Sequence, residues 1–349
     1  RQTACLSLYA MIGEICGLVS LDRKTSIHVI VFDSLTHSAI SENYLGVRNP
    51  ATDYLSMLDD TIYAGIKGFV ERVPTRNFYA ALFELEREKG NYKAFSGRTP
   101  SFLTGLLRKN GYYIQTGYSD SYFGSSQGDY VDRYIFEVVD LKFSLICAAQ
   151  MPLLGICSEL SRTIYKHWFR GLFFEEIRNK EWPENVMRLI DQAEREVTGP
   201  IFSAFHIYSP VGHTSNTHQT NDPEMVAKYK ERFISQTERA RGLMEDIHHL
   251  RKRFPDSIFI VSGDHGPYLS RTEEEDRRFI VLDRHAVALS LLNATNLCPW
   301  AMNWLEQQRY LTPGRMLAAS LACDGESRKL TEHFTDNEEF IRFGESLDN

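Results

Sequence analysis

The stretch Ser257-Ile258-Phe259-Ile260-Val261-Ser262-Gly263-Asp264-His265-Gly266 places two metal-binding side chains directly after a hydrophobic run. The β-branched and aromatic residues that follow Pro255 predict a short, buried strand. The two flanking glycines let the backbone turn sharply, so that Asp264 and His265 can face one point. Ligands of open α/β sheets gather at the carboxyl ends of strands, so this pattern indicates part of a ligand site. Taken alone, the Asp-His pair can equally be an ordinary turn with a capping aspartate.

A second apolar run ends in an acidic residue in the same way. Residues 27–32 (IHVIVF) have strand length and are mostly apolar, which is typical of a strand covered on both faces of a sheet. Asp33 follows directly, and a lone acid there could simply cap a helix. Two strand ends that carry carboxylates, one of them beside a histidine, predict an oxygen- and nitrogen-rich site for a divalent cation.

A third element offers a hydroxyl group. The apolar spacing within residues 73–85 is helical, and Pro74-Thr75 forms a suitable helix entry. At a helix N-terminus the free backbone N–H groups and the helix dipole favour an anion, and a metal-activated hydroxyl there could attack phosphorus. The simpler alternative is that Thr75 only caps the helix.

These elements, in this order, resemble the alkaline phosphatase superfamily, and in particular its sulfatase-like branch. That branch contains lipoteichoic acid synthases, phosphoethanolamine and phosphoglycerol transferases, and nucleotide pyrophosphatase/phosphodiesterases. The step from Thr99-Pro100-Ser101 to Lys109-Asn110-Gly111-Tyr112 is similar to the family's helix, Gly-Tyr and strand unit, and the resemblance spans roughly residues 25 to 300. The other matching stretches are Val31-Phe32-Asp33-Ser34-Leu35, Thr75 and Ser262-Gly263-Asp264-His265-Gly266.

The resemblance implies an α/β fold with a mostly parallel central sheet covered by helices on both faces. It also implies one divalent ion, manganese or zinc with magnesium as a further possibility. The implied ligands are Asp33, Thr75, Asp264 and His265. Thr75 would be the nucleophile and would form a covalent phospho-threonine intermediate. The second acceptor would be water in a hydrolase or an alcohol in a transferase, and the residues do not choose between them.

Three further residues are implied substrate contacts: Arg76, His213 and His285. His213 ends the segment Ser209-Pro210-Val211-Gly212-His213, which lacks the aspartate that two-metal phosphodiesterases carry there. We therefore interpret His213 as a phosphate or leaving-group contact, and expect His206 to be an ordinary histidine on the face of a strand. His285 follows an apolar run, and its alternative is a structural or surface role.

Two departures from the family pattern leave the substrate open. Val73-Pro74-Thr75-Arg76 lacks the Cys or Ser that matures to formylglycine, so sulfuric-ester hydrolysis is only an alternative. Asp33 stands where lipoteichoic-acid-type transferases usually carry Glu. We expect a transferase or phosphodiesterase acting on a phosphoglycerol or phosphoethanolamine type of substrate, within a phosphorylated lipid or glycan. A sulfatase-like binding module without turnover is the alternative from another class.

Length and charge agree with one α/β unit and a smaller appended region. The chain has 349 residues and a net charge of −7, which argues against a nucleic-acid partner. We expect an N-terminal segment over 1–24, a sulfatase-like domain over 25–300, and a more polar C-terminal region over 301–349 packed on it.

No apolar run reaches the roughly 20 residues that cross a bilayer. Many relatives carry membrane helices before this domain, so we expect an extracytoplasmic (periplasmic or cell-surface) portion of a membrane-anchored protein. Six cysteines match no zinc-finger spacing and could be free thiols or disulfides. Cys298 and Cys323 are the best candidate pair.

Overall fold

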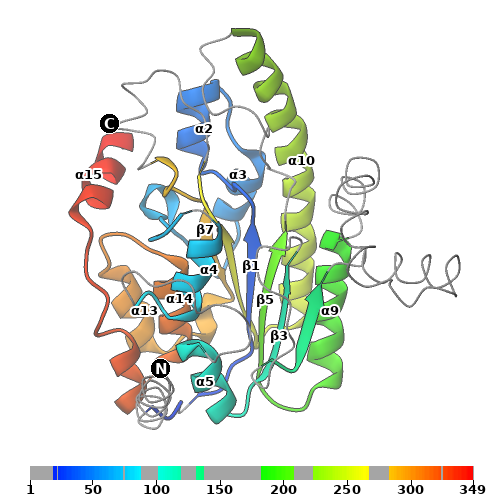
Figure 1. Ribbon diagram of the computed structural model, residues 1–349, viewed down its shortest axis with the longest axis vertical. Coiled ribbons are helices and arrows are strands. Elements are labelled where there is room, and N and C mark those ends of the chain that lie inside the picture. Colours follow the sequence, from blue (N-terminus) through cyan, green and yellow to red (C-terminus); the bar gives the residue numbers. More distant parts are fainter. Residues whose placement is uncertain are drawn as a thin grey trace, which may run out of the picture.

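The computed structural model describes residues 19–21, 23–73, 75–87, 101–118, 131–136, 182–207, 223–266, 283–323 and 325–348. Within these residues, seven strands form one sheet in the order β2-β7-β6-β1-β5-β3-β4 (Figure 1). Their bounds are β1 Ile27–Phe32, β2 Thr61–Tyr63, β3 Tyr113–Tyr118, β4 Arg133–Phe136, β5 Ile201–Ile207, β6 Ile258–Gly263 and β7 Leu289–Leu292.

The centre of the sheet is parallel. Strand β1 pairs in parallel with β5 and β6, and β3 pairs in parallel with β4 and β5. Only β7 runs against its neighbours β6 and β2. All six residues of β1 and all six of β6 are buried, as expected for strands covered on both faces. The predicted fold class, an α/β fold with a mostly parallel sheet, is confirmed.

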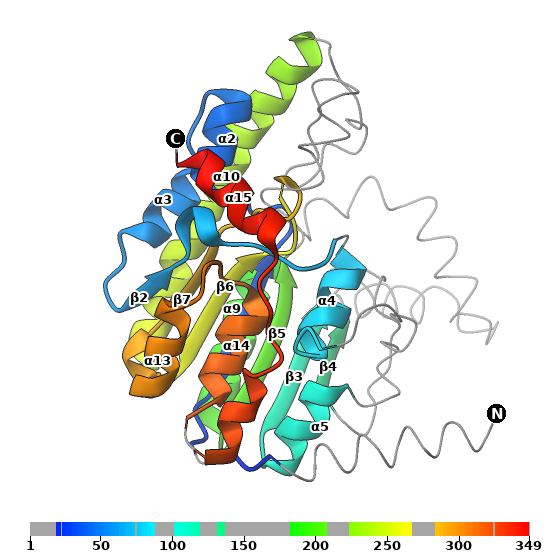
Figure 2. The same ribbon diagram turned by 90° about the vertical axis from the view of Figure 1, so that its left-hand side faces the viewer.

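One face of the sheet packs against four helices near the front of Figure 2. These helices are α4 (Thr75–Phe83), α5 (Phe102–Lys109), α13 (Pro299–Glu306) and α14 (Pro313–Leu321). Their apolar side chains form one core with alternate residues of the central strands, among them Val29, Val31 and Ile260. Because side chains alternate across a strand, the intervening residues face the other layer.

The second face carries α3 (Pro50–Ser56), α9 (Trp182–Glu196) and the long α10 (Pro223–Arg253), with α2 (Ser38–Leu45) beside them (Figure 1). Its core includes Ile30, Phe32 and Val261. A third cluster joins α15 (Glu338–Leu347) to the segment around Phe69. Short 3-10 turns at Gly65–Lys67, Ala294–Asn296 and Gly325–Leu330 complete the described elements. No helix within the described ranges combines the length and hydropathy needed to cross a membrane.

Two expected helix boundaries can be compared with the structure. Helix α4 begins at Thr75, as predicted. The Thr99-Pro100 pair in the sequence predicts Thr99 as the N-cap of α5, with proline at the first helical position. The N-cap is instead Ser101, whose side chain accepts a hydrogen bond from the Thr104 N–H. Ser101 and Thr104 form a reciprocal capping box, which fixes the start two residues later.

The region after residue 300 contributes more to the core than its polar composition suggested. Nearly all of α14 is buried, and Met316 and Leu317 belong to the core of the first face. Helix α14 thus lies against the sheet. A domain boundary at residue 300 stays a prediction.

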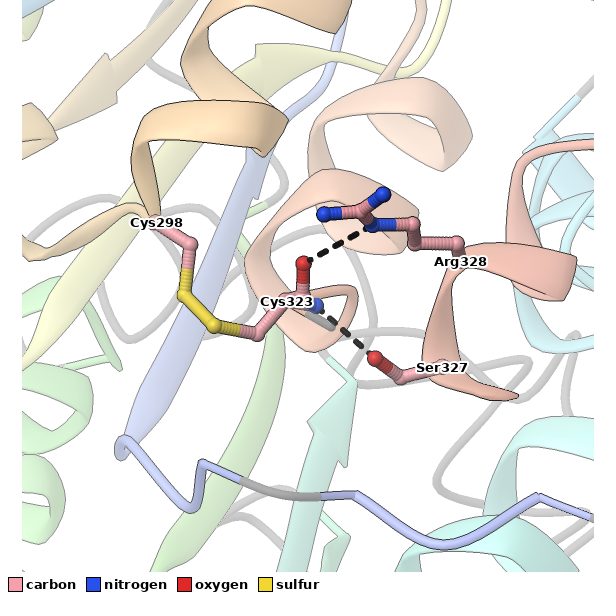
Figure 3. The surroundings of a disulfide bond; sticks show 4 residues. All are labelled: Cys298, Cys323, Ser327 and Arg328. Atoms are coloured by element: carbon pink, nitrogen blue, oxygen red, sulfur yellow. Dashed lines mark hydrogen bonds between the residues drawn. A yellow bond between two sulfur atoms is a disulfide. The ribbon is translucent and has the colours of Figure 1, made fainter. Parts of the chain in front are cut away.

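The disulfide between Cys298 and Cys323 confirms the predicted pair (Figure 3). Cys298 is the N-cap residue of α13, and Cys323 follows the end of α14. The Cys323 N–H donates to the Ser327 hydroxyl at 2.9 Å, and the Cys323 carbonyl accepts from Arg328 Nε at 3.4 Å. The bond thus joins two helices that cover the same face of the sheet.

Replacing Cys298 and Cys323 together with serine should lower the free energy of unfolding by about 3 kcal/mol, because the bond closes a loop of 25 residues. Urea denaturation with and without a reductant would measure this. A reductant should destabilise the wild type alone and leave the double variant unchanged. Equal stability of wild type and double variant would contradict the prediction.

A buried carboxyl group links α4 to α14 and makes the stability depend on pH. Glu86 is partly exposed as a residue, but its carboxyl accepts a hydrogen bond from Thr312 Oγ1 at 2.9 Å and lies against Gly314. Burial raises the pKa of Glu86 to about 8, and the charge of Glu71 contributes to the increase. An acid whose pKa is higher in the folded than in the unfolded state stabilises the fold fully only below its unfolded pKa.

We therefore expect the free energy of unfolding to fall between about pH 5 and pH 8, by about 1–3 kcal/mol after allowance for solvent screening. Glu86→Gln should flatten this fall, because glutamine stays neutral. Denaturation curves at several pH values would measure both, with exposed Glu306→Gln as the control. An unchanged slope in Glu86→Gln would refute the assignment to Glu86.

Candidate metal centre

The two acidic strand ends lie side by side because β1 and β6 are neighbours in the sheet. Phe32 pairs with Gly263, so the next residues on each strand, Asp33 and Asp264, leave the sheet together. The Asp33 N–H donates to the Ile207 carbonyl at 3.0 Å, and the Asp264 N–H donates to the Phe32 carbonyl at 3.1 Å. The backbone of both acids is thereby fixed by the three central strands.

Asp33, Asp264 and His265 form a compact group of metal-ligating atoms. One ligand atom from each lies within 4.8 Å of the others, and all three residues are buried. His265 Nε2 is 3.3 Å from Asp33 Oδ1 and 3.7 Å from Asp264 Oδ1. Ligands bound to one ion at roughly 2.0–2.6 Å lie about 3–5 Å apart, so these donors fit a divalent cation. A mixed oxygen and imidazole set suits zinc or manganese better than calcium.

Thr75 approaches the same group from the start of α4. Its Oγ1 donates a hydrogen bond of 2.5 Å to Asp264 Oδ2. Such a short O–H···O contact is characteristic of a charged acceptor. The structure therefore brings together the four residues that were predicted as metal ligands, and places a hydroxyl at a helix N-terminus beside the carboxylates.

The carboxylate of Asp264 and the imidazolium of His265 each favour the charged form of the other. Burial of Asp264 disfavours its ionised form, but the neighbouring His265 and His206, together with the Thr75 hydroxyl, hold the pKa of Asp264 well below its ordinary value. Burial of His265 disfavours its protonated form, yet Asp264 and Asp33 raise the pKa of His265 to about 9. Without a metal the imidazolium therefore balances part of the negative charge, and a cation would take over that task.

The orientation of His265 is set by the loop that follows it. Its Nδ1 lies 2.7 Å from the Gly266 carbonyl, which can only accept a hydrogen bond, so Nδ1 carries a proton. The other nitrogen, Nε2, faces the two carboxylates and is the atom that would bind a cation. A side chain at Gly266 would collide with the Asp283 and Ala286 carbonyls, so this turn requires glycine.

His206 is a neighbour of the site that the sequence did not reveal. It lies on β5, is 3 % exposed, and its Nε2 is 3.5 Å from Asp264 Oδ2. Tyr79 of α4 packs edge-on against its ring at 5.7 Å between centroids. It does lie on a strand face, as expected, but on the part that borders Asp264.

The predicted substrate contacts are placed only in part. His213 and the side chain of Arg76 lie outside the described residues. His285 Nδ1 is 2.6 Å from the Val70 carbonyl, and its ring packs against Phe340 at 5.2 Å between centroids. Burial lowers the pKa of His285. These contacts suit a structural role, and substrate binding by His285 stays a prediction.

Comparisons with known proteins place the fold. No protein-family model matches the chain, and no curated protein matches it. The C-terminal periplasmic domain of EptC from Escherichia coli superimposes with TM-scores of 0.53 alone and 0.52 in a complex with zinc, at 12% identity. The zinc complex covers 91% of this chain and 90% of its own. The matching domain of the phosphoethanolamine transferase EptC from Campylobacter jejuni has a TM-score of 0.49 at 12% identity, covering 90% of this chain and 96% of its own.

The strand order, the helical layers and the superposition on the Escherichia coli domain define one class of fold. The chain has the alkaline phosphatase-like fold of the sulfatase-like type, as its motifs predicted. Among solved structures, the chain is similar to the periplasmic domain of Escherichia coli EptC over nine-tenths of both chains. At 12% identity this similarity concerns the fold, so the chemistry has to be argued from the site itself.

Proposed function

We propose that this protein is a metal-dependent enzyme that transfers or hydrolyses a phosphodiester group through a covalent phospho-threonine. The hydrogen bond from Thr75 to Asp264, inside a group of three metal-ligating side chains, carries the proposal. A purely structural helix start would not need a hydrogen bond to a buried carboxylate that belongs to a group of three metal-ligating side chains.

The reaction follows from the positions of these side chains. Bound to Asp33, Asp264 and His265, a divalent ion would supply positive charge that favours the Thr75 alkoxide and neutralises the phosphate. Thr75 Oγ1 forms a bond to phosphorus, the bond from phosphorus to the leaving alcohol breaks, and that alcohol takes up a proton. Asp264 Oδ2 is the acceptor of the Thr75 hydroxyl before the attack. In the second half, the oxygen of water or an alcohol forms a bond to phosphorus, the bond from phosphorus to Thr75 Oγ1 breaks, and the proton lost by the attacking oxygen restores the Thr75 hydroxyl.

We favour zinc over manganese as the ion, with magnesium third. The site contains an imidazole, and the similar Escherichia coli domain has been solved as a zinc complex. The motif resemblance supports a phosphoethanolamine or phosphoglycerol type of substrate, on a lipid or glycan.

An extracytoplasmic location forms part of the proposal. The Cys298–Cys323 disulfide is of a kind that persists in oxidising compartments, and the similar Escherichia coli EptC domain is periplasmic. A phosphorylated lipid substrate would further require access to a membrane surface.

The proposal is tested with metal-free protein and defined substrates. Zinc, manganese or magnesium is added, and release of nitrophenol is measured from bis(p-nitrophenyl) phosphate, p-nitrophenyl phosphate and p-nitrophenyl sulfate. We expect metal-dependent turnover of the diester above that of the sulfate, and a mass increase on the peptide containing Thr75 after rapid quenching. Tight metal binding without turnover of any ester would favour the binding module, and a preference for the sulfate would favour sulfuric-ester hydrolysis.

A further inference from the structure

We infer that Ser34 is a positioning residue that holds Asp33, Asp264 and His265 in the arrangement a divalent cation requires; this inference rests on the proposed function. Ser34 follows the first acidic ligand and is 4 % exposed. It contacts every member of the three-residue group, and it does so with both its backbone and its side chain.

The contacts of Ser34 are short and distributed over two strand ends. Its N–H donates to Asp264 Oδ1 at 3.0 Å. Its hydroxyl donates to Asp33 Oδ1 at 3.1 Å and lies 3.2 Å from His265 Nδ1. Asp264 and His265 are 230 and 231 positions away in the chain, so these bonds join the end of β1 to the end of β6.

The direction of each hydrogen bond is consistent with this role. The His265 Nδ1 proton is shared between the Gly266 carbonyl and the Ser34 oxygen, since the carbonyl can only accept. The Ser34 hydroxyl hydrogen then points to Asp33. One hydroxyl therefore orients the imidazole and a carboxylate together, as outer-shell groups of metal sites commonly do.

The backbone conformation of Ser34 makes the double role possible. Its φ of 57° lies in the left-handed region, which is uncommon for residues other than glycine. This turn aims the N–H at Asp264 while the side chain points to Asp33 and His265. Glycine would adopt this turn without cost, so a serine in this conformation favours a use of its hydroxyl.

The same contacts argue against Ser34 as the nucleophile. The Ser34 hydroxyl oxygen is held between Asp33 and His265. The Thr75 hydroxyl, at the start of α4, instead donates to Asp264 Oδ2. A nucleophile and a positioning residue differ in one measurable way. Excess metal can compensate for a weakened site but cannot replace a nucleophile.

The test compares Ser34→Gly with Ser34→Ala by titrating zinc or manganese into metal-free protein in a calorimeter. Both variants remove the hydroxyl, and we expect metal affinity to fall about 10- to 100-fold in each. Only alanine leaves a Cβ in the left-handed region, so the metal-free alanine variant should unfold at a lower temperature than the glycine variant. Ser41→Ala is the control, because Ser41 is equally buried and its hydroxyl donates to the Ser38 carbonyl.

Turnover at rising metal concentration completes the test. Saturating metal should restore most of the kcat of Ser34→Gly, and should leave Thr75→Ala inactive. Metal affinity within twofold of wild type in both Ser34 variants would overturn the inference while leaving the metal centre intact. Loss of turnover that saturating metal cannot restore would also overturn it, in favour of a direct chemical role. A wild type that binds no metal would instead overturn the proposed function, and the inference with it.

Discussion

Replacement of Thr75 with alanine is expected to lower the turnover of a phosphodiester by about 10⁴-fold or more, with folding nearly intact. The hydroxyl of Thr75 is the one oxygen nucleophile that the described residues place on Asp264 Oδ2, so its loss removes the group that would attack phosphorus. The cost to stability is modest, because the variant loses one hydrogen bond to a charged group, about 1.5–3 kcal/mol.

Thr75→Ser is the matched variant, since it keeps the hydroxyl and removes only a methyl group. It should retain measurable turnover and still gain the mass of the phosphoryl group after quenching, whereas Thr75→Ala should show neither. Metal titration distinguishes the two possible roles of Thr75, because the alanine variant should still bind a cation through its three remaining ligands. Wild-type turnover in Thr75→Ala would leave Thr75 only a structural role at the start of α4.

The sequence was sufficient to predict the two strands that build the site. Residues 27–32 and 258–263 are mostly apolar, and each run is followed by an acid, so two buried strands with polar ends could be expected. The motif order placed Thr75 at a helix start, and α4 begins there. These features are local in the sequence, and local patterns do not depend on how distant segments meet.

Contacts between segments that are distant in the chain could not be predicted from the sequence. The role of His206 depends on the order of strands β6, β1 and β5, which sets which residue of β5 borders Asp264. From the sequence alone, Ser34 is an ordinary turn residue. Its left-handed φ and its hydrogen bond to Asp264, 230 positions away, are visible only in the structure. The polar composition after residue 300 also gave no sign that α14 would be buried. Its Arg315 donates hydrogen bonds to the Thr335 carbonyl and to Asp336.

Replacement of Asp264 with asparagine is expected to weaken zinc or manganese binding by more than about 100-fold and to lower turnover at least as much. Asp264 occupies the centre of the site: its Oδ1 accepts from the Ser34 N–H, and its Oδ2 accepts from Thr75. In asparagine, an amide NH₂ group replaces one of these two oxygens. It would then face the Ser34 N–H or the Thr75 hydroxyl, which donate to a carboxylate oxygen in the wild type. The variant would also remove the charge that raises the pKa of His265, so the metal-free imidazole should titrate at lower pH.

The measurement has two parts that must agree. Calorimetric titration gives the metal affinity of Asp264→Asn against Asp53→Asn, a control whose carboxylate is bound to Arg48 and Ser38 on another part of the fold. Chelation of the wild-type metal should reproduce the loss of turnover, and added metal should reverse it in the wild type but only weakly in Asp264→Asn. Metal affinity unchanged in Asp264→Asn would show that the cation binds elsewhere. In that case the hydrogen bond from Thr75 to Asp264 would only tie the start of α4 to the end of β6, because a carboxylate that binds no metal offers the hydroxyl an acceptor but no source of activation.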